Sequence, residues 1–313
     1  MIVVCGEALF DVFPQQQTAM GLQLSARNGG SPFNLAVGLA RLGEAPIFFG
    51  GLARDVFGRR LESALLAEGV NLDSAPRSDA PSPLVIVSLD DAGHPTYAFY
   101  GGNTAECQVQ LPHLALLPAD VRAVHVGSYC MVAEPVASTL RALVERQRGR
   151  SLITYDPNVR LSIEPQVQRW RDALQWMLTR SDIIKISEED IEALYPSLSI
   201  DAFIEQALLS GVALTVVTRG AQGMVARAAT AGRLELPATR VDVVDTVGAG
   251  DTFQAALLAG LSRSGQLRRE ALEAMERDGL AHVLAFASRA AGITCTRRGA
   301  DLPTLAELNA ALQ

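Results

Sequence analysis

Short apolar runs recur along the chain, and small or polar residues follow each of them. A strand that is buried on both faces has a continuous apolar run, so these segments predict the strands of a parallel sheet. The expected strands are 2–9, 45–51, 123–126, 152–156, 183–186 and 213–218, and 241–244 is expected to end another. Segments 225–228 and 233–236 would continue a hairpin that begins after residue 218. Longer stretches with apolar residues at helical spacing predict helices from residue 32 onward and at 54–68, 134–147, 254–261 and 280–291.

From residue 123 onward the expected strands and helices alternate along the chain. This order is typical of a parallel sheet with right-handed crossovers, so the predicted fold class is α/β. Two further runs, 84–89 and 96–100, are joined by the turn-rich segment 90–95 and predict a hairpin. Segment 18–27 is expected to form short strands. No repeat, low-complexity segment or linker divides the chain, so one domain over residues 1–313 is expected.

Composition narrows the class of protein further. The chain has 313 residues, 49% of them hydrophobic and 19% charged, which is typical of a folded globular protein. A net charge of -7 argues against a nucleic-acid partner, because such proteins need a concentrated basic surface. The four cysteines lack paired spacing, and neither a signal peptide nor an apolar run of about 18 residues occurs. These features predict a cytoplasmic protein without a membrane-spanning segment.

The glycine-rich turn Gly248-Ala249-Gly250 lies between an expected strand and an expected helix. Without bulky side chains, the first N–H groups of that helix are open to an anion at its positive end. Asp251 follows directly and can accept the proton of an attacking hydroxyl, so the turn predicts phosphoryl-transfer chemistry. A dinucleotide fingerprint fits less well, because Phe253 occupies its third glycine position, and no P-loop motif occurs. A glycine turn without a ligand is the remaining interpretation.

Two segments resemble the signatures of the ribokinase-like (PfkB-type) sugar kinases. They are Asp-Thr-Val-Gly-Ala-Gly-Asp-Thr-Phe at 245–253 and Gly-Gly-Ser-Pro-Phe-Asn-Leu-Ala-Val-Gly-Leu-Ala-Arg-Leu-Gly at 29–43. The resemblance spans the whole chain. It implies a three-layer ribokinase-like α/β domain with a mostly parallel sheet and a small β-sheet lid from about 11–28 and 82–104. It also implies transfer of the ATP γ-phosphoryl group to a sugar hydroxyl.

The resemblance places the sugar between Asp11, Gly29, Gly30 and Asn34 on one side and the catalytic turn on the other. Asp11 follows the first expected strand, where parallel sheets bind ligands, although a loop-capping role would also explain it. Adjacent glycines suit a hinge or a backbone pressed against a ligand. Asn103, in a polar glycine-rich stretch, is a further sugar contact if the stretch is more than a plain turn.

The segment Asp-Pro-Asn-Val-Arg at 156–160 ends an expected strand and matches a pattern of the same family. Asn158 is therefore a candidate contact of the nucleotide, and Arg160 of the sugar or a phosphate, because a guanidinium suits phosphate oxygens. The alternative is that the aspartate and the arginine of this loop bind only each other.

Further nucleotide contacts follow from the resemblance. Lys185 is expected to reach the phosphates, and Ser288 stands where many members have an adenine-contacting asparagine. The turn at 218–223 resembles the nucleotide turn of the family, although a hairpin would also explain it. Its expected contacts are Thr218, Arg219, Gly220 and Gly223.

Metal ligands are less well defined. Mg²⁺ is expected mainly with the nucleotide, since the sequence lacks a metal cage. Asp190 is a candidate Mg²⁺ ligand, but it is one methylene shorter than the glutamate usual in the family. Asp245 and Val247 lie just before the anion turn, where members of the family often bind a monovalent cation such as K⁺ through backbone carbonyls.

The segments 156–160, 218–220 and 297–300 look most like those of bacterial fructokinases, which make fructose 6-phosphate. Ribokinase and 2-keto-3-deoxygluconate kinase stay as alternatives, and a non-catalytic sugar-sensing binder is disfavoured because Asp251 and both glycines are present. A homodimer through the lid is also expected. Leu84, Ile86 and Ser88 would line one face of a lid strand, with Val85, Val87 and Leu89 on the other. One apolar face would then meet water and favour association.

Overall fold

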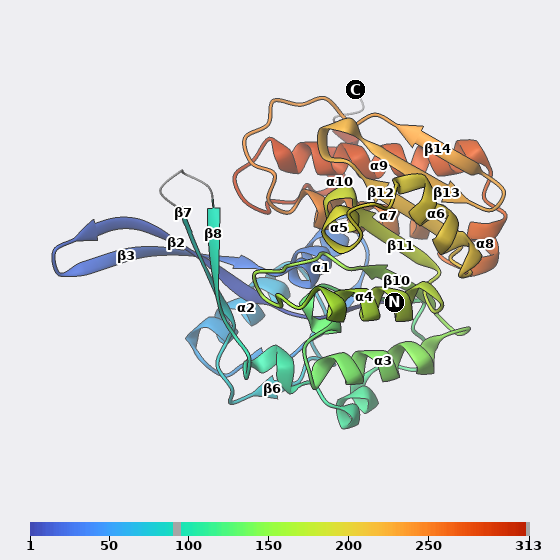
Figure 1. Ribbon diagram of the computed structural model, residues 1–313. Coiled ribbons are helices and arrows are strands. Elements are labelled where there is room, and N and C mark those ends of the chain that lie inside the picture. Colours follow the sequence, from blue (N-terminus) through green and yellow to red (C-terminus); the bar gives the residue numbers. More distant parts are fainter. Residues whose placement is uncertain (90–94, 311–313) are drawn as a thin grey trace.

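A large sheet runs through the centre of the protein (Figure 1). The computed structural model describes residues 1–89 and 95–310, so the predicted turn at 90–94 lies outside the described residues. Over these residues the sheet has eight strands in the order β14-β13-β12-β11-β10-β9-β1-β4. The six strands from β12 to β4 are parallel, and β13 and β14 add an antiparallel edge. The strands are β1 (Ile2–Cys5), β4 (Pro46–Phe49), β9 (Ala123–Gly127), β10 (Leu152–Asp156), β11 (Ile183–Ser187), β12 (Leu214–Thr218), β13 (Met224–Ala228) and β14 (Gly232–Leu236).

Helices cover both faces of this sheet and complete a three-layer fold. Side chains of adjacent strand positions point to opposite faces, so Val4 joins one apolar cluster and Val3 the other. The first cluster is covered by α1 (Ser31–Arg41), α2 (Val56–Ala67), α7 (Ala249–Arg263), α8 (Arg269–Glu273), α9 (Arg277–Cys295) and α10 (Leu305–Ala310). The second is covered by α3 (Val136–Gln147), α4 (Val167–Leu178), α5 (Glu188–Leu194) and α6 (Ile200–Leu209). The predicted α/β class is confirmed.

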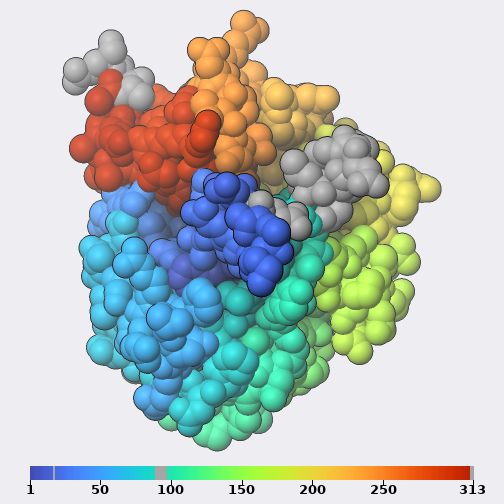
Figure 2. Space-filling view, turned by 90° about the vertical axis from the view of Figure 1, so that its left-hand side faces the viewer, coloured from blue at the N-terminus to red at the C-terminus, as the bar shows by residue number. Residues whose placement is uncertain are grey.

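A separate four-stranded sheet projects from the large one, in the order β3-β2-β7-β8. Its strands are β2 (Leu9–Thr18), β3 (Gly21–Gly29), β7 (Leu84–Leu89) and β8 (Pro95–Tyr100). The β2–β3 hairpin extends away from the body (Figure 1), and Figure 2 faces this side of the molecule, with the hairpin in blue below the C-terminal segment in red. Minor elements are β5 (Leu52–Ala53), β6 (Arg77–Ser78) and the 3₁₀ helices η1 (Ala105–Gln108), η2 (Leu111–Leu116), η3 (Tyr129–Met131) and η4 (Gly220–Gln222).

The register of the small sheet shows which residues share a face with Asp11. Asp11 lies opposite Val85, so Val85 and Val87 share the face that carries Asp11. Val85 is only 6% exposed and Val87 packs against the second core cluster, whereas Tyr97, opposite Val87, is 52% exposed.

The opposite face of the small sheet also bears exposed apolar side chains. Leu24 is opposite Pro14 in the register, and Tyr100 is opposite Leu84. Leu24 and Tyr100 are 48% and 63% exposed. We call the face that bears Pro14, Leu24, Ala98 and Tyr100 the outer lid face.

Two strand predictions were wrong. Residues 241–244 form no strand, because Val244 donates its N–H to the carbonyl of Cys295 at the end of α9, and Val243 is 62% exposed. The first strand ends at Cys5 instead of Leu9, because Gly6 has a φ of +138° and turns the chain, and Leu9 begins the small sheet.

Candidate active site

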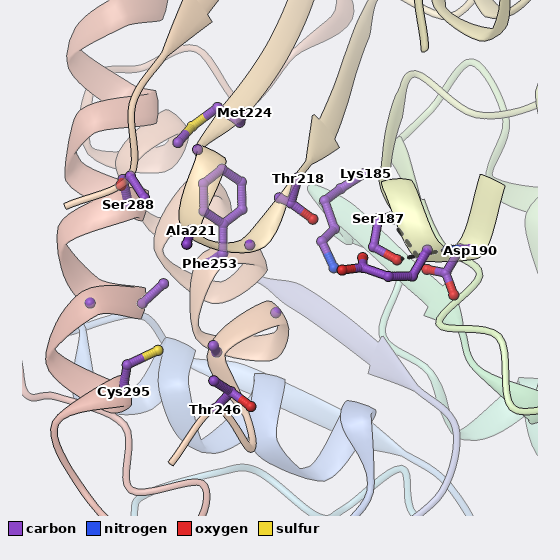
Figure 3. A pocket seen from close by; sticks show the side chains of 18 of the residues that line it. Lys185, Ser187, Asp190, Thr218, Ala221, Met224, Thr246, Phe253, Ser288 and Cys295 are labelled. Atoms are coloured by element: carbon purple, nitrogen blue, oxygen red, sulfur yellow. Dashed lines mark hydrogen bonds between the residues drawn. The ribbon is translucent and has the colours of Figure 1, made fainter. Parts of the chain in front are cut away.

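The carboxyl ends of β10, β11 and β12 open onto a pocket of about 970 Å³, bounded on the other side by α7 and α9 (Figure 3). This is the edge of a parallel sheet at which ligands bind. Many of the residues selected from the sequence line it. They are Asn158, Arg160, Lys185, Asp190, Thr218, Gly220, Gly223, Ala249, Gly250 and Ser288.

The anion turn begins α7 at one end of this pocket. Gly248 has a φ of +78°, in the left-handed region that glycine favours. A Cβ at this position would lie 2.5 Å from the Cβ of Ala300, so no other residue fits. Asp245 holds the turn by accepting N–H bonds from Val247 at 3.1 Å and Gly299 at 2.8 Å. The N–H of Ala249, the first residue of α7, donates to the carbonyl of Thr246 at 3.2 Å. The next N–H groups, those of Gly250 and Asp251, lack partners within the helix and are available to a phosphate.

Asp251, in the first turn of α7, is bound by two side chains of α1. The hydroxyl of Ser31 donates to Oδ1 at 2.6 Å, and Nδ2 of Asn34 donates to Oδ2 at 2.8 Å. Burial raises the pKa of the Asp251 carboxyl, while these two donors and Lys185 favour its charged form. The arrangement gives a carboxylate of increased basicity, held in a fixed orientation next to the anion turn.

Lys185 brings a positive charge to the same place. Its Nζ donates to Oδ2 of Asp156 at 2.8 Å, and both side chains are buried. Burial opposes the charge on Lys185, but the Asp156 carboxylate outweighs it and raises the pKa of the lysine. A Cβ on Gly250 would lie 3.1 Å from Nζ, so the ammonium borders the turn where a phosphate would lie.

Asp11, Gly29 and Gly30 form the adjoining part of the site, next to Asp251. A Cβ on Gly29 would lie 2.4 Å from Oδ2 of Asp11, so glycine is needed for this carboxylate to fit. Burial raises the pKa of Asp11 to about 6, with Arg160 opposing this rise and Asp251 adding to it. Asp11, Arg160 and Asp251 thus lie within electrostatic reach of one another.

Asn103 follows β8, the last strand of the small sheet. It is exposed, accepts a bond from Nε2 of Gln108 at 2.7 Å and does not line the pocket. Its role in sugar binding stays a prediction.

The far end of the pocket is apolar. Phe253 and Met224 face it together with Ser288 and Cys295 (Figure 3), a lining that suits an aromatic base. Ser288 Oγ accepts the N–H of Thr239 at 3.1 Å, so its hydroxyl is already engaged.

The turn after β12 forms one wall of this end and also connects the β12–β13 hairpin. Gly223 has a φ of +87°, and a Cβ there would meet the carbonyl of Leu236 at 2.1 Å. Arg219 points elsewhere: it binds Glu235 at 2.8 Å and borders a second, smaller cavity. Of the turn residues selected from the sequence, Arg219 alone is thus turned away from the first pocket.

Both carboxylate oxygens of Asp190, the candidate metal ligand, accept hydrogen bonds from backbone N–H groups. One oxygen accepts the N–H of Val159 at 2.9 Å, and the other accepts the N–H of Ser187 at 3.3 Å. Asp190 therefore joins the 156–160 loop to the start of α5. Within residues 1–89 and 95–310, no group of three or more His, Cys, Asp and Glu side chains could hold a metal ion. Glu189 is exposed at the pocket wall.

Sequence reasoning missed two contacts of this site. Ser31 was not selected, although it follows Gly30 and begins the same helix as Asn34, so its position was a usable signal. Asp156 was noted only as part of a loop. Its bond to Lys185 joins neighbouring strands that are separated by a whole helix in the sequence, and no local pattern predicts such a pair.

An α/β sheet with a projecting β-sheet and an anion turn beside a nucleotide-sized pocket is the architecture of an ATP-dependent sugar kinase. Comparison with known proteins agrees: residues 1–307 match the pfkB family carbohydrate kinases, and the chain belongs to this family. A fructokinase of Rhizobium leguminosarum bv. trifolii is 35% identical over 281 residues, which are 90% of this chain and 85% of that protein.

Solved structures of two fructokinases resemble the whole chain. The Xylella fastidiosa enzyme with bound ATP has a TM-score of 0.89 at 27% identity, covering 100% of this chain and 98% of that one. The Vibrio cholerae O395 enzyme, with fructose, ADP and calcium bound, has a TM-score of 0.84 at 26% identity and the same coverage. None of the helices in the described part of the chain has the length and apolarity that a membrane crossing requires.

Proposed function

We propose that this protein is a fructokinase, which transfers the γ-phosphoryl group of ATP to fructose and releases fructose 6-phosphate and ADP. The observation that carries the proposal is the position of Asp251, between the anion turn of the pocket and the Asp11–Gly29–Gly30 group. Relatives named fructokinases support the choice of sugar.

In the proposed reaction the sugar lies against Asp11, Gly30 and Asn34, with one hydroxyl directed at Asp251. Asp251 takes the proton of this hydroxyl while its oxygen forms a bond to the γ-phosphorus. The bond from that phosphorus to the β–γ bridging oxygen breaks, and the electron pair leaves with ADP. The N–H groups at the start of α7 and the ammonium of Lys185 stabilise the charge that develops on the phosphoryl oxygens.

Mg²⁺ would accompany the nucleotide. This ion keeps several waters and binds through phosphates plus one or two carboxylates, so it does not need a protein cage. Glu189, exposed at the pocket wall, and Asp190 are the carboxylates placed to contact its water shell. A monovalent cation such as K⁺ beside the backbone of Asp245 and Val247 also belongs to the proposal, as does a cytoplasmic location.

A coupled assay of ADP release tests the proposal. Fructose, ribose and 2-keto-3-deoxygluconate are offered at equal concentrations with ATP and Mg²⁺. We expect the highest kcat/KM with fructose. A preference for ribose or the keto-acid would identify that compound, instead of fructose, as the substrate. Sugar binding without turnover of any of them would indicate a sensor.

We further propose that two copies associate through the outer lid face. Leu24 and Tyr100 are large, exposed and on the same face, together with Pro14 and Ala98. An apolar sheet face with an unpaired neighbouring edge is a surface that proteins usually cover. A second lid of identical shape would cover it symmetrically.

A further inference from the structure

Two buried glutamates lie where the chain enters and leaves the small sheet. Glu7 stands between β1 and the first lid strand β2, and Glu106 lies in η1, shortly after the last lid strand β8. They are 2% and 1% exposed. Glutamate is rarely buried to this extent unless it is paired, and neither residue belongs to the proposed phosphoryl-transfer machinery.

Both glutamates contact the segment that follows β9. The hydroxyl of Tyr129 donates to Oε1 of Glu106 at 2.9 Å, and Thr104 donates to the same oxygen. The side chains of Ser128 and Cys130 bond to Glu7. In each glutamate the second oxygen, Oε2, is buried without a hydrogen-bond partner in the described protein.

The groups around these two glutamates do not neutralise the negative charges of their carboxylates. The groups that face the pair are Thr104, directly before η1, Cys107 of η1, and Ser128, Tyr129 and Cys130 from the segment after β9. None of these is a cation. Two buried carboxylates without a cation cannot both be ionised at small cost, because each disfavours the charge of the other. Burial accordingly raises the pKa of Glu7 to about 7, and that of Glu106 is raised too.

Glu7 also supports the sugar side of the active site. Its backbone oxygen lies 2.9 Å, and its Cγ 3.3 Å, from the position that a Cβ on Gly30 would occupy. Tyr129, the partner of Glu106, packs its ring against Phe99 of β8 with centroids 5.2 Å apart. The two glutamates therefore connect the glycine pair, two of the points at which the lid joins the body and the end of β9.

We infer that Glu7 and Glu106 form a carboxyl pair that holds a proton at neutral pH and acts as a positioning device for the lid and Gly30. A proton on either glutamate removes one of the two charges and gives that carboxyl a donor. Removal of that proton leaves two charges in apolar surroundings, which loosens the lid at the β1–β2 and β8–η1 joints and weakens sugar binding. The inference rests on the proposed sugar site at Gly29 and Gly30.

The proton can be observed without any substrate. Infrared spectra of the wild type and of the Glu7→Gln/Glu106→Gln variant are compared as the pH rises from about 7 to about 9. We expect a protonated-carboxyl band in the wild type that disappears over this range and is missing from the variant. An identical band in both proteins would overturn the inference, whichever sugar proves to be the substrate.

Kinetics test the positioning role. The KM for fructose should rise about fivefold or more over the same pH range, while the KM for ATP changes much less. In Glu106→Gln the amide imitates the protonated acid, so this rise should disappear at an unchanged kcat. Glu205→Gln, at an exposed position of α6, is the matched control. An equal pH dependence in wild type and Glu106→Gln would contradict the role.

Discussion

Nδ2 of Asn34 lies 2.8 Å from Oδ2 of Asp251, although 217 positions separate the two residues in the sequence. The proposed sugar contact and the proposed base are thus bonded to each other before a substrate binds. Each carboxylate oxygen can accept a second bond, so an incoming hydroxyl can reach Asp251 while Ser31 and Asn34 keep the carboxylate in place.

Replacement of Asp251 by Asn tests the base directly. The amide keeps the shape but cannot take a proton, so kcat should fall by about 10²–10⁴, with much smaller changes in sugar and ATP affinity. Steady-state kinetics at saturating substrates measure this. Asp278→Asn, in the first turn of α9, should retain full activity. If Asp251→Asn kept more than about a third of kcat, the assignment would be wrong.

Gly250→Val should abolish turnover without unfolding the protein. A Cβ at this position already lies 3.1 Å from Nζ of Lys185, and a branched side chain would fill the place of the phosphate. Circular dichroism should remain native while ADP release stops. Gly279→Val in α9 is the control, because a Cβ there meets Met275 at an ordinary 3.6 Å. Full activity of Gly250→Val would show that the turn does not contact phosphate.

The ion pair of Lys185 and Asp156 should contribute separately to stability and to catalysis. Lys185→Met leaves a buried carboxylate unpaired and should lower the free energy of unfolding by about 3–5 kcal/mol. Lys185→Met/Asp156→Leu should regain most of this stability, as measured by urea denaturation, yet stay inactive. Recovery of kcat in the double variant would mean that the lysine serves the fold alone.

Sugar binding should weaken at acidic pH because of Asp11. Its pKa is raised to about 6, and a carboxylate accepts hydroxyl bonds better than the neutral acid does. The KM for fructose should therefore rise as the pH falls through about 6. Asp11→Asn should have a high KM that no longer changes in this range. If the KM of Asp11→Asn also rose at acidic pH, a group other than Asp11 would cause the rise.

The lid dimer should depend on Leu24. Leu24→Lys places a charge on the outer lid face and should dissociate the dimer and raise the KM for the sugar. Val87→Lys tests a different surface, because Val87 shares the face of Asp11. Leu209→Lys, at a position of α6 that is 82% exposed, is the control. A monomeric wild-type mass by light scattering at micromolar concentration would reject the dimer.

The large sheet could be predicted because its strands are buried on both faces, and a short continuous apolar run such as 152–156 is typical of a strand in that position. The same reasoning wrongly predicted a strand at residues 241–244. Val241 and Val243 border the pocket, and the N–H of Val244 bonds to Cys295 at the end of α9, which no periodicity reveals.

The sequence indicated where the backbone needs glycine, but it did not indicate which distant residues bond to each other. Gly29, Gly30 and Gly248 were selected because adjacent or turn glycines imply close contact, and each is confined by a named neighbour. The bonds of Ser31 to Asp251 and of Glu106 to Tyr129 depend on how distant segments fold together. The exposed side of the lid depended on strand register, which alternation alone does not fix.

The contact between α1 and α7 has a consequence for synthesis of the protein. Ser31 and Asp251 are 220 positions apart, so a ribosome adding about 5–20 residues per second needs roughly 10–40 s to supply the second residue after the first. Until then the buried side of α1, including Leu35 and Leu39, lacks the helix that covers it. We therefore expect the nascent chain to need protection by chaperones for most of its translation, because the base is added only in its last fifth.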